Sequence, residues 1–165
     1  MKKKSSVQKT KPEPTADGKL HLLGAGHTRY PASPDEARLE AFPNRYAGRD
    51  YLIQFDCPEF TCLCPITGQP DFGRIQIEYV ADKLCLESKS LKLYLFSYRS
   101  HPGFHEAVVN RMLDDIVRAI RPRRLRVRGV FNPRGGIALT VTACWPATSG
   151  LADGGILCNE VGATG

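Results

Sequence analysis

The fold is decided by residues 124–145, RLRVRGVFNPRGGIALTVTACW, which form the most regular pattern in the chain. Apolar and polar residues alternate on both sides of a central segment, residues 132–136, that is rich in Asn, Pro and Gly. A period of two predicts half-buried strands, and the central composition favours a hairpin turn. We therefore expect antiparallel strands at residues 124–131 and 137–145.

Two helices are predicted before this hairpin. From His105 to Ile120 apolar pairs recur every four residues and stop before Pro122, which is the spacing of a helix with one buried face. In residues 87–98 the leucines also fit the alternation of a strand, but Glu, Lys and Leu dominate the segment, and these residues favour a helix.

Two more strands are predicted at residues 51–56 and 74–81, where apolar residues alternate again. The stretch between them includes residues 60–73, FTCLCPITGQPDFG, with two prolines and two glycines. Because proline donates no ladder hydrogen bond and glycine packs no side chain, we expect a shaped loop that joins the strands as a wide hairpin.

The predicted order is strand, strand, helix, helix, strand, strand, which is an α+β fold with a four-stranded antiparallel sheet and two helices. Such a sheet buries one face under its helices. We expect the other face and both edges to need cover, and oligomerisation is the natural way to supply it.

The composition predicts one folded domain, residues 21–145, between two tails. The chain has 165 residues, 42% of them hydrophobic, and a formal net charge of +6. Residues 1–20 contribute +4 of this charge and almost no apolar side chains, so we expect a disordered basic tail. Residues 146–165 are rich in Gly and Ala and are expected to form a loose tail.

An RNA-binding module that uses the basic tail is one alternative function. The tail has no interleaved aromatic residues and the rest of the chain carries only a small positive charge, so we expect a solubilising tail without direct nucleic-acid contact. The basic start is not followed by the apolar run of a signal peptide, and no window approaches 18 consecutive apolar residues. We expect a cytoplasmic protein that has no membrane contact, with cysteines that are thiols, metal ligands or nucleophiles rather than disulfides.

A cysteine and an aspartate in residues 60–73 suggest a thiol nucleophile beside a proton donor. Cys62 and Cys64 both precede Asp71, and residues two apart in an extended segment point the same way. The residues alone leave the nucleophile open, and either thiol could instead be a small buried hydrophobe.

Residues 87–94, ESKSLKLY, fit all eight positions of the signature of the QueF nitrile reductases, the NADPH-dependent 7-cyano-7-deazaguanine reductases of queuosine biosynthesis. The runs at residues 63–65 and 67–72 and the triplet at 104–106 also resemble that family, in the same order and at similar separations. The resemblance covers roughly residues 50–145.

This resemblance implies a tunnelling fold that assembles into rings of identical subunits with active sites between them. It implies reduction of the nitrile of 7-cyano-7-deazaguanine to 7-aminomethyl-7-deazaguanine with NADPH, in a pathway of tRNA modification. Cys64 would be the nucleophile that forms a thioimide, and Asp71 would be the proton donor. A thiolate suits this task because it adds to a nitrile carbon that is otherwise a weak acceptor of hydride.

The resemblance also implies the contacts of the two small molecules. The substrate contacts are Leu86 through its backbone, Glu87, Ser88, His105 and Glu106, and the NADPH contacts are Ser88, Lys89, Arg134 and Gly135. A carboxylate such as Glu106 suits the N–H edge of a guanine-like ring, and the cations suit a phosphorylated cofactor. No G-x-G-x-x-G run follows a predicted strand, so the cofactor would be held without a Rossmann unit.

A metal site is the second alternative. Cys57, Cys62 and Cys64 could bind zinc with Cys85 or a histidine, as in a zinc enzyme of the GTP cyclohydrolase I type, a related group with the tunnelling fold. The Cys-x4-Cys-x-Cys spacing lacks the Cys-x2-Cys pair of structural zinc sites, so we expect no metal in this chain.

Overall fold

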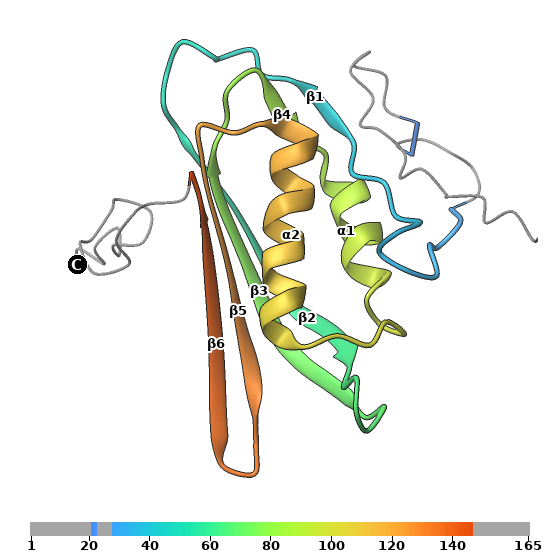
Figure 1. Cartoon of the computed structure of the whole chain (residues 1–165). Coiled ribbons are helices and arrows are strands. Elements are labelled where there is room, and N and C mark those ends of the chain that lie inside the picture. The colour runs from blue at the N-terminus through green and yellow to red at the C-terminus, as the bar shows by residue number, and fades with distance from the viewer. Residues whose placement is uncertain (1–20, 23–27, 147–165) are drawn as a thin grey trace, which may run out of the picture.

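The computed structural model describes residues 21–22 and 28–146. Within these residues, the main sheet is antiparallel with strand order β2-β3-β5-β6, and two helices lie on one of its faces (Figure 1). The bounds are β2 (Leu52–Leu63), β3 (Pro70–Val80), α1 (Ser88–Phe96), α2 (His105–Ile120), β5 (Arg124–Arg134) and β6 (Ile137–Trp145). The α+β class and the order of the six elements are confirmed. The predicted tails lie outside the described residues, apart from Pro146.

The core lies between the sheet and the helices. Every second residue of β3 and β5 is buried against the apolar faces of α1 and α2, as the alternation predicts. The largest core side chains include Ile75, Ile77, Tyr79, Leu125, Val127, Tyr94, Val109, Met112, Ile116 and Ile120. The predicted bounds of α2 are confirmed at both ends, and the helix ends where Arg121 adopts a left-handed conformation with φ of 43° just before Pro122.

The prediction of a long loop at residues 57–73 is wrong. β2 continues to Leu63 and β3 begins at Pro70, so only residues 64–69 connect them. Proline is tolerated as the first residue of β3, which is Pro70. A register shift between Cys57 and Phe60 accommodates Pro58 within β2.

Gly73 belongs to β3 because of a close approach between strands. A Cβ atom at this position would lie 2.7 Å from the backbone oxygen of Val130 on β5. Glycine therefore allows β3 and β5 to pair here, where the sequence pattern favoured a loop.

The hairpin between β5 and β6 is tighter than predicted. β5 extends to Arg134, with a register shift between Phe131 and Arg134, and only Gly135 and Gly136 form the turn. Both glycines have positive φ, 55° and 81°, as the two central residues of a type I′ turn require.

A second, two-stranded sheet was not predicted. β1 (Ala41–Pro43) pairs with β4 (Leu84–Leu86) in antiparallel register. Strands of three residues are too short for an alternation pattern to reveal them.

The sheet face away from the helices carries charged and polar side chains, namely Arg74, Gln76 and Glu78 on β3 and Arg124, Arg126 and Arg128 on β5. Arg126 pairs with Glu78, and the Arg74 Nε lies 3.3 Å from Asp56. Charged side chains of both signs are stable in water, so this face does not need cover in the single chain, and its cover by another subunit stays a prediction. The outer edges of β2 and β6 still lack a strand partner within the described residues. Neither described helix is long and apolar enough to span a membrane.

Candidate active site

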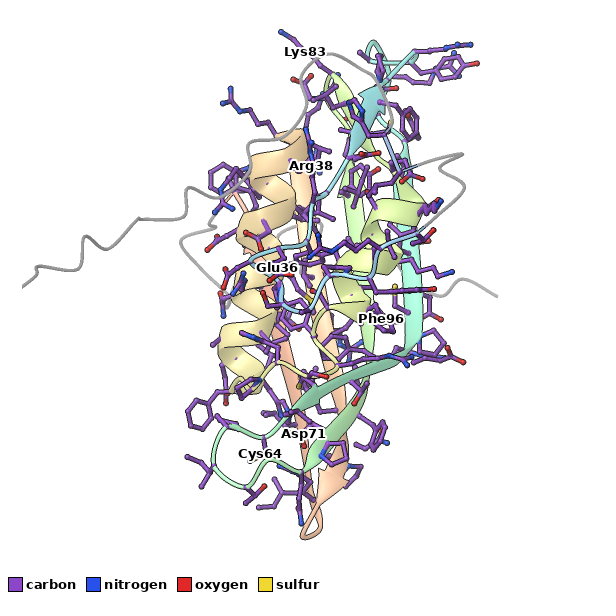
Figure 2. The ribbon with its side chains drawn as sticks, turned by 90° about the vertical axis from the view of Figure 1, so that its right-hand side faces the viewer. Glu36, Arg38, Cys64, Asp71, Lys83 and Phe96 are labelled. Atoms are coloured by element: carbon purple, nitrogen blue, oxygen red, sulfur yellow. The ribbon has the colours of Figure 1, made fainter. Side chains whose placement is uncertain are left out.

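The end of the sheet at the β2–β3 connection brings together residues from four segments. Cys64 begins the connection, Asp71 is the second residue of β3, His105 is the first residue of α2, and Arg134 ends β5. Cys64 and Asp71 are labelled close together at this end in Figure 2. The connection between β2 and β3, the start of α2 and the end of β5, which are far apart in sequence, therefore contribute to one cluster.

Cys64 is held by a turn and by a neighbouring segment. Its backbone N–H donates to the Gln69 oxygen at 2.8 Å, and its own oxygen accepts from the Gly68 N–H at 2.9 Å. Leu63, the preceding residue, exchanges backbone hydrogen bonds with His101 and Gly103, which lie between the two helices. Backbone hydrogen bonds of Cys64 and of the preceding residue therefore fix the position of the thiol.

The environment of Cys64 favours the thiolate. Hydrogen bonds from the Thr67 side chain, from the backbone N–H groups of Thr67 and Ile66, and from Arg134 lower the pKa of this thiol to about 6. A turn whose N–H groups converge on a negative charge acts in this way in many anion sites. These contacts therefore favour ionisation of the Cys64 thiol near neutral pH.

Cys62 has the opposite environment. It is fully buried on β2, where it is the register partner of Asp71. Burial, with a further contribution from the charge of Asp71, raises the pKa of its thiol to about 11. This contrast separates the two thiols that the residues alone left open, in favour of Cys64.

Asp71 is a buried carboxylate with two different neighbours. Its side chain is 4% exposed. One oxygen lies 2.8 Å from the Arg134 Nε, and the other lies 3.3 Å from the His105 Nε2. The second distance is within ion-pair range, but the geometry is not that of a hydrogen bond, so the buried His105 Nε2 has no hydrogen-bond partner.

The His105 ring is held in place by stacking. It lies parallel to the Phe131 ring of β5, with centroids 3.7 Å apart and an angle of 5° between the planes. Phe131 and Thr67 are functional neighbours that sequence reasoning missed. Thr67 stands inside the motif run that contains Asp71, whereas Phe131 looked like any core residue of a strand.

The remaining predicted residues on this side of the molecule fit the cluster. Glu106 is exposed in the first turn of α2, next to His105. Gly135 follows Arg134 in the turn, and the space around its Cα is open. Arg134 itself, predicted as a cofactor contact, instead pairs with Asp71 in this structure, although its side chain is 44% exposed.

A second group of predicted residues lies elsewhere in the chain, at the junction of β4 and α1. The Leu86 N–H donates to the Tyr79 hydroxyl, and the Glu87 carboxylate caps α1 by accepting from the N–H groups of Lys89 and Ser90 at 2.8 and 2.7 Å. In Figure 2, Phe96 at the other end of α1 lies nearer to Cys64 than this junction does. The single chain does not bring the two groups together.

Lys89 is engaged by the N-terminal segment. Its Nζ donates to the Leu22 oxygen at 2.6 Å. The fully buried carboxylate of Glu40 accepts from the N–H groups of His21 and Leu22 at 3.1 and 3.2 Å. These hydrogen bonds hold residues 21–22 over the start of α1.

A cavity of about 460 Å³ lies between β2 and α1, beside this second group. Ser88 contributes to its wall, and so do Leu91, Lys92, Leu95, Phe55 and Phe60. The cavity is mostly apolar with a few polar groups, which is the usual character of a small-molecule site. Cys64 and Asp71 do not line it.

The zinc ligands that were considered as an alternative are not assembled. Cys57, Cys62, Cys64 and Cys85 are free thiols, and among the residues that the structure describes only Cys62 of these four belongs to a group of donor atoms that could hold an ion. Its companions are Asp71 and His105. The expectation that no metal is bound remains a prediction.

Comparisons with known proteins agree with the motifs. A family model described as "QueF-like protein" matches residues 70–149. The NADPH-dependent 7-cyano-7-deazaguanine reductase of Streptococcus thermophilus is 57% identical over 120 residues, which cover 73% of this chain and 74% of that protein. Reductases of the same name from Parabacteroides distasonis and Nitratidesulfovibrio vulgaris are 52% and 48% identical, over 74% and 78% of this chain and 78% and 79% of theirs.

A solved structure supports the fold. The apo crystal structure of the archaeosine synthase QueF-Like has a TM-score of 0.53 and 22% sequence identity to this chain, over 56% of this chain and 91% of the other. At this identity the likeness concerns the fold alone.

Proposed function

The chain belongs to the QueF family, and from this premise we propose that it reduces the nitrile of 7-cyano-7-deazaguanine to an aminomethyl group with two molecules of NADPH, in queuosine biosynthesis. The observation that carries the proposal is the pair formed by a thiol that is acidic, Cys64, and a buried carboxyl group, Asp71, at one end of the sheet.

The first step uses Cys64. Its thiolate adds to the nitrile carbon, one C–N π bond becomes a lone pair on nitrogen, and this nitrogen takes a proton, which gives a covalent thioimide. The lowered pKa of Cys64 keeps the thiol ionised for this attack. Asp71 relays this proton: its carboxylate takes up a proton from solvent and passes it to the nitrogen.

Two reductions follow. When bound, NADPH would supply one hydride for the carbon that is bonded to Cys64 and, from a second molecule, one for the imine that remains after the thiol has left. Between them the C–S bond breaks, Cys64 leaves as a thiolate, and an imine remains. With a proton added at nitrogen for each hydride, the imine becomes a primary amine, and Cys64 is ready for another cycle.

Arg134 has two tasks in this mechanism. Its guanidinium stabilises the Cys64 thiolate and holds the Asp71 carboxylate at 2.8 Å. Because its side chain is partly exposed at the end of a tight turn, it also reaches solvent, where a phosphate of the cofactor would bind. Gly135 lies beside Arg134 in the turn, whereas Ser88 and Lys89 lie at the junction of β4 and α1 and would come from a neighbouring subunit to complete a surface for a phosphorylated cofactor.

The complete site forms between subunits. The catalytic cluster and the junction at Glu87 and Ser88 are separate in one chain, and a neighbouring copy in a ring would supply the second group to the first. Exposed apolar side chains lie next to the members of the catalytic cluster in sequence, each within three positions of one of them. These are Ile66, Phe72, Phe104 and Ile137, with exposures of 78%, 54%, 59% and 75%.

Exposed apolar side chains at this density favour a contact with another protein surface. The unpaired edges of β2 and β6 favour the same arrangement, because pairing between subunits would close them. The glutamate cap at α1 does not prevent a substrate contact, since a carboxylate offers about four acceptor positions.

The test is mass spectrometry of the full chain with 7-cyano-7-deazaguanine in the absence of NADPH, followed by a measurement of cofactor use. We expect a covalent adduct with the mass of the nitrile, because addition of the thiol loses no atoms. After NADPH is added, two molecules should be oxidised per amine formed. Absence of the adduct together with absence of nitrile-dependent NADPH oxidation would refute the proposed function.

A further inference from the structure

The catalytic end of the molecule holds a set of donor atoms that the proposed reaction does not use together. The Cys62 sulfur, a carboxylate oxygen of Asp71 and a ring nitrogen of His105 lie within 4.8 Å of one another. They come from β2, β3 and the start of α2. Cys62 is fully buried and Asp71 nearly so.

The contacts of these atoms leave donor positions that a cation could use. Asp71 directs one oxygen to Arg134, and its other oxygen faces His105. The His105 Nε2 is shielded from solvent and has no hydrogen-bond partner among the residues that the structure describes. A buried nitrogen without a partner is unfavourable, and a bound cation would remove this cost if the ring presents a lone pair.

We propose that Cys62, Asp71 and His105 form an inhibitory site for a thiophilic divalent cation, with Zn²⁺ as the best fit. One sulfur, one imidazole nitrogen and one carboxylate oxygen are the ligands that zinc accepts in tetrahedral sites, with a fourth position left for water. Binding displaces the proton of the Cys62 thiol to solvent and involves no change in oxidation state. The inhibition rests on the proposed function, because a cation on Asp71 removes the proton donor. The binding of the cation does not rest on the proposed function.

Two features make this an inhibitory site rather than one for a resident metal. Cys62 is fully buried, and metal binding must displace the proton of its thiol, which weakens affinity. The positive charge of Arg134 beside Asp71 opposes a second cation as well. Cys62 already packs in the hydrophobic core, so the fold does not depend on an ion.

Direct binding is the first arm of the test. Zn²⁺ is titrated into the full chain with a phosphine reductant and a chromogenic chelator as competitor, and Co²⁺ is used as a spectroscopic probe of a bound thiolate. Wild type and Cys64→Ala should each bind one Zn²⁺ with similar affinity and give the Co²⁺–thiolate absorption. Cys62→Ala should bind at least about tenfold more weakly and lack that absorption. Cys62→Ser, which is closer in size, provides a second variant if the alanine variant is unstable.

Turnover is the second arm. Zn²⁺ should inhibit nitrile-dependent NADPH oxidation by wild type, a chelator should restore it, and Cys62→Ala should keep its activity in the presence of Zn²⁺. Zn²⁺ binding that survives in Cys62→Ala but is lost in Cys64→Ala would overturn the assignment, and so would the absence of binding in wild type. If the cation binds as described but wild type does not reduce the nitrile, the proposed function fails and the site stands. If wild type reduces the nitrile and ignores Zn²⁺, the site fails and the function stands.

Discussion

Cys62 and Cys64 are two residues apart, and their surroundings give them opposite reactivity. We predict that Cys64→Ala abolishes both the covalent adduct and turnover, because without this thiol no thioimide forms. Cys62→Ala should retain both, since the buried Cys62 thiol stays protonated at neutral pH. Intact-protein mass spectrometry and NADPH oxidation measure the two outcomes. An adduct on Cys64→Ala combined with an inactive Cys62→Ala would reverse the assignment.

Asp71 is expected to affect chemistry more than binding. Asp71→Asn keeps the shape of the side chain but cannot supply a proton in the same way, so turnover should fall by roughly a hundredfold. Binding of the nitrile, measured by calorimetry in the Cys64→Ala background, should change little. Normal turnover of Asp71→Asn would exclude the aspartate as the proton donor.

The acidity of Cys64 predicts a pH dependence. Only the thiolate reacts, so the rate of alkylation by iodoacetamide should rise with pH around a midpoint of about 6 and reach a plateau above it. Thr67→Val removes the contact that lowers the pKa most, so its midpoint should shift to higher pH. Arg134→Ala should shift it in the same direction by less. Cys64→Ala measures the background from the other thiols, and an unchanged midpoint in Thr67→Val would contradict the assigned cause.

At the scale of the elements, the close pairing of β3 and β5 at Gly73 supports the catalytic end of the sheet. Gly73→Ala would force its Cβ against the backbone oxygen of Val130 and push the strands apart two residues from Asp71. We predict a loss of about 1 to 3 kcal/mol in the free energy of unfolding, together with lower turnover. Gly48→Ala is the matched control, because the space around Gly48 is open. Thermal melting of the two variants measures the difference in stability, and equal melting temperatures would refute the steric argument.

The regular elements were predictable because their patterns are local. The bounds of α2 follow from apolar periodicity and a following proline, and the hairpin of β5 and β6 follows from alternation around a glycine pair. The length of β2 and β3 did not follow, because prolines and glycines were read as loop residues. Whether a glycine in a strand marks a loop or a close approach depends on the facing strand, here Val130, which no local pattern contains.

The site was predictable in its residues but only in part in its arrangement. The motif resemblance supplied Cys64, Asp71 and His105, which the structure brings together. The ion pair between Asp71 and Arg134 did not follow from the sequence, because it joins the start of β3 to the end of β5 and the pattern did not give the exact lengths of these strands. The effect of Thr67 on the acidity of Cys64 depends on the tight turn of residues 64–69, which the sequence showed only as a loop.

For the whole molecule, the separation of the two residue groups predicts that inactive variants complement each other. Cys64→Ala and Glu87→Gln should each be inactive or nearly so as pure proteins. After dissociation and reassembly of a 1:1 mixture, about one quarter of the interfaces would combine an intact Cys64 with an intact Glu87, and activity should return to about that fraction. Glutamine retains an acceptor oxygen for the cap of α1, so the variant should fold.

A mixture of Cys64→Ala with Asp71→Asn is the matched control. Both changes lie in the same half of the site, so no interface in that mixture is intact and no activity should return. Light scattering must first establish that wild type is larger than a dimer. Recovery in the control mixture, or its absence in the first, would argue against an active site between subunits.

The hydrogen bonds that hold residues 21–22 over α1 are expected to affect the binding of the cofactor. The Lys89 ammonium already donates to the Leu22 oxygen, and the same group is the predicted contact of the NADPH phosphate. Docking of this segment and binding of the cofactor then compete for one cation, and thermodynamic reciprocity requires each to weaken the other. We therefore expect Glu40, which accepts from the N–H groups of His21 and Leu22, to influence the affinity for NADPH through this segment.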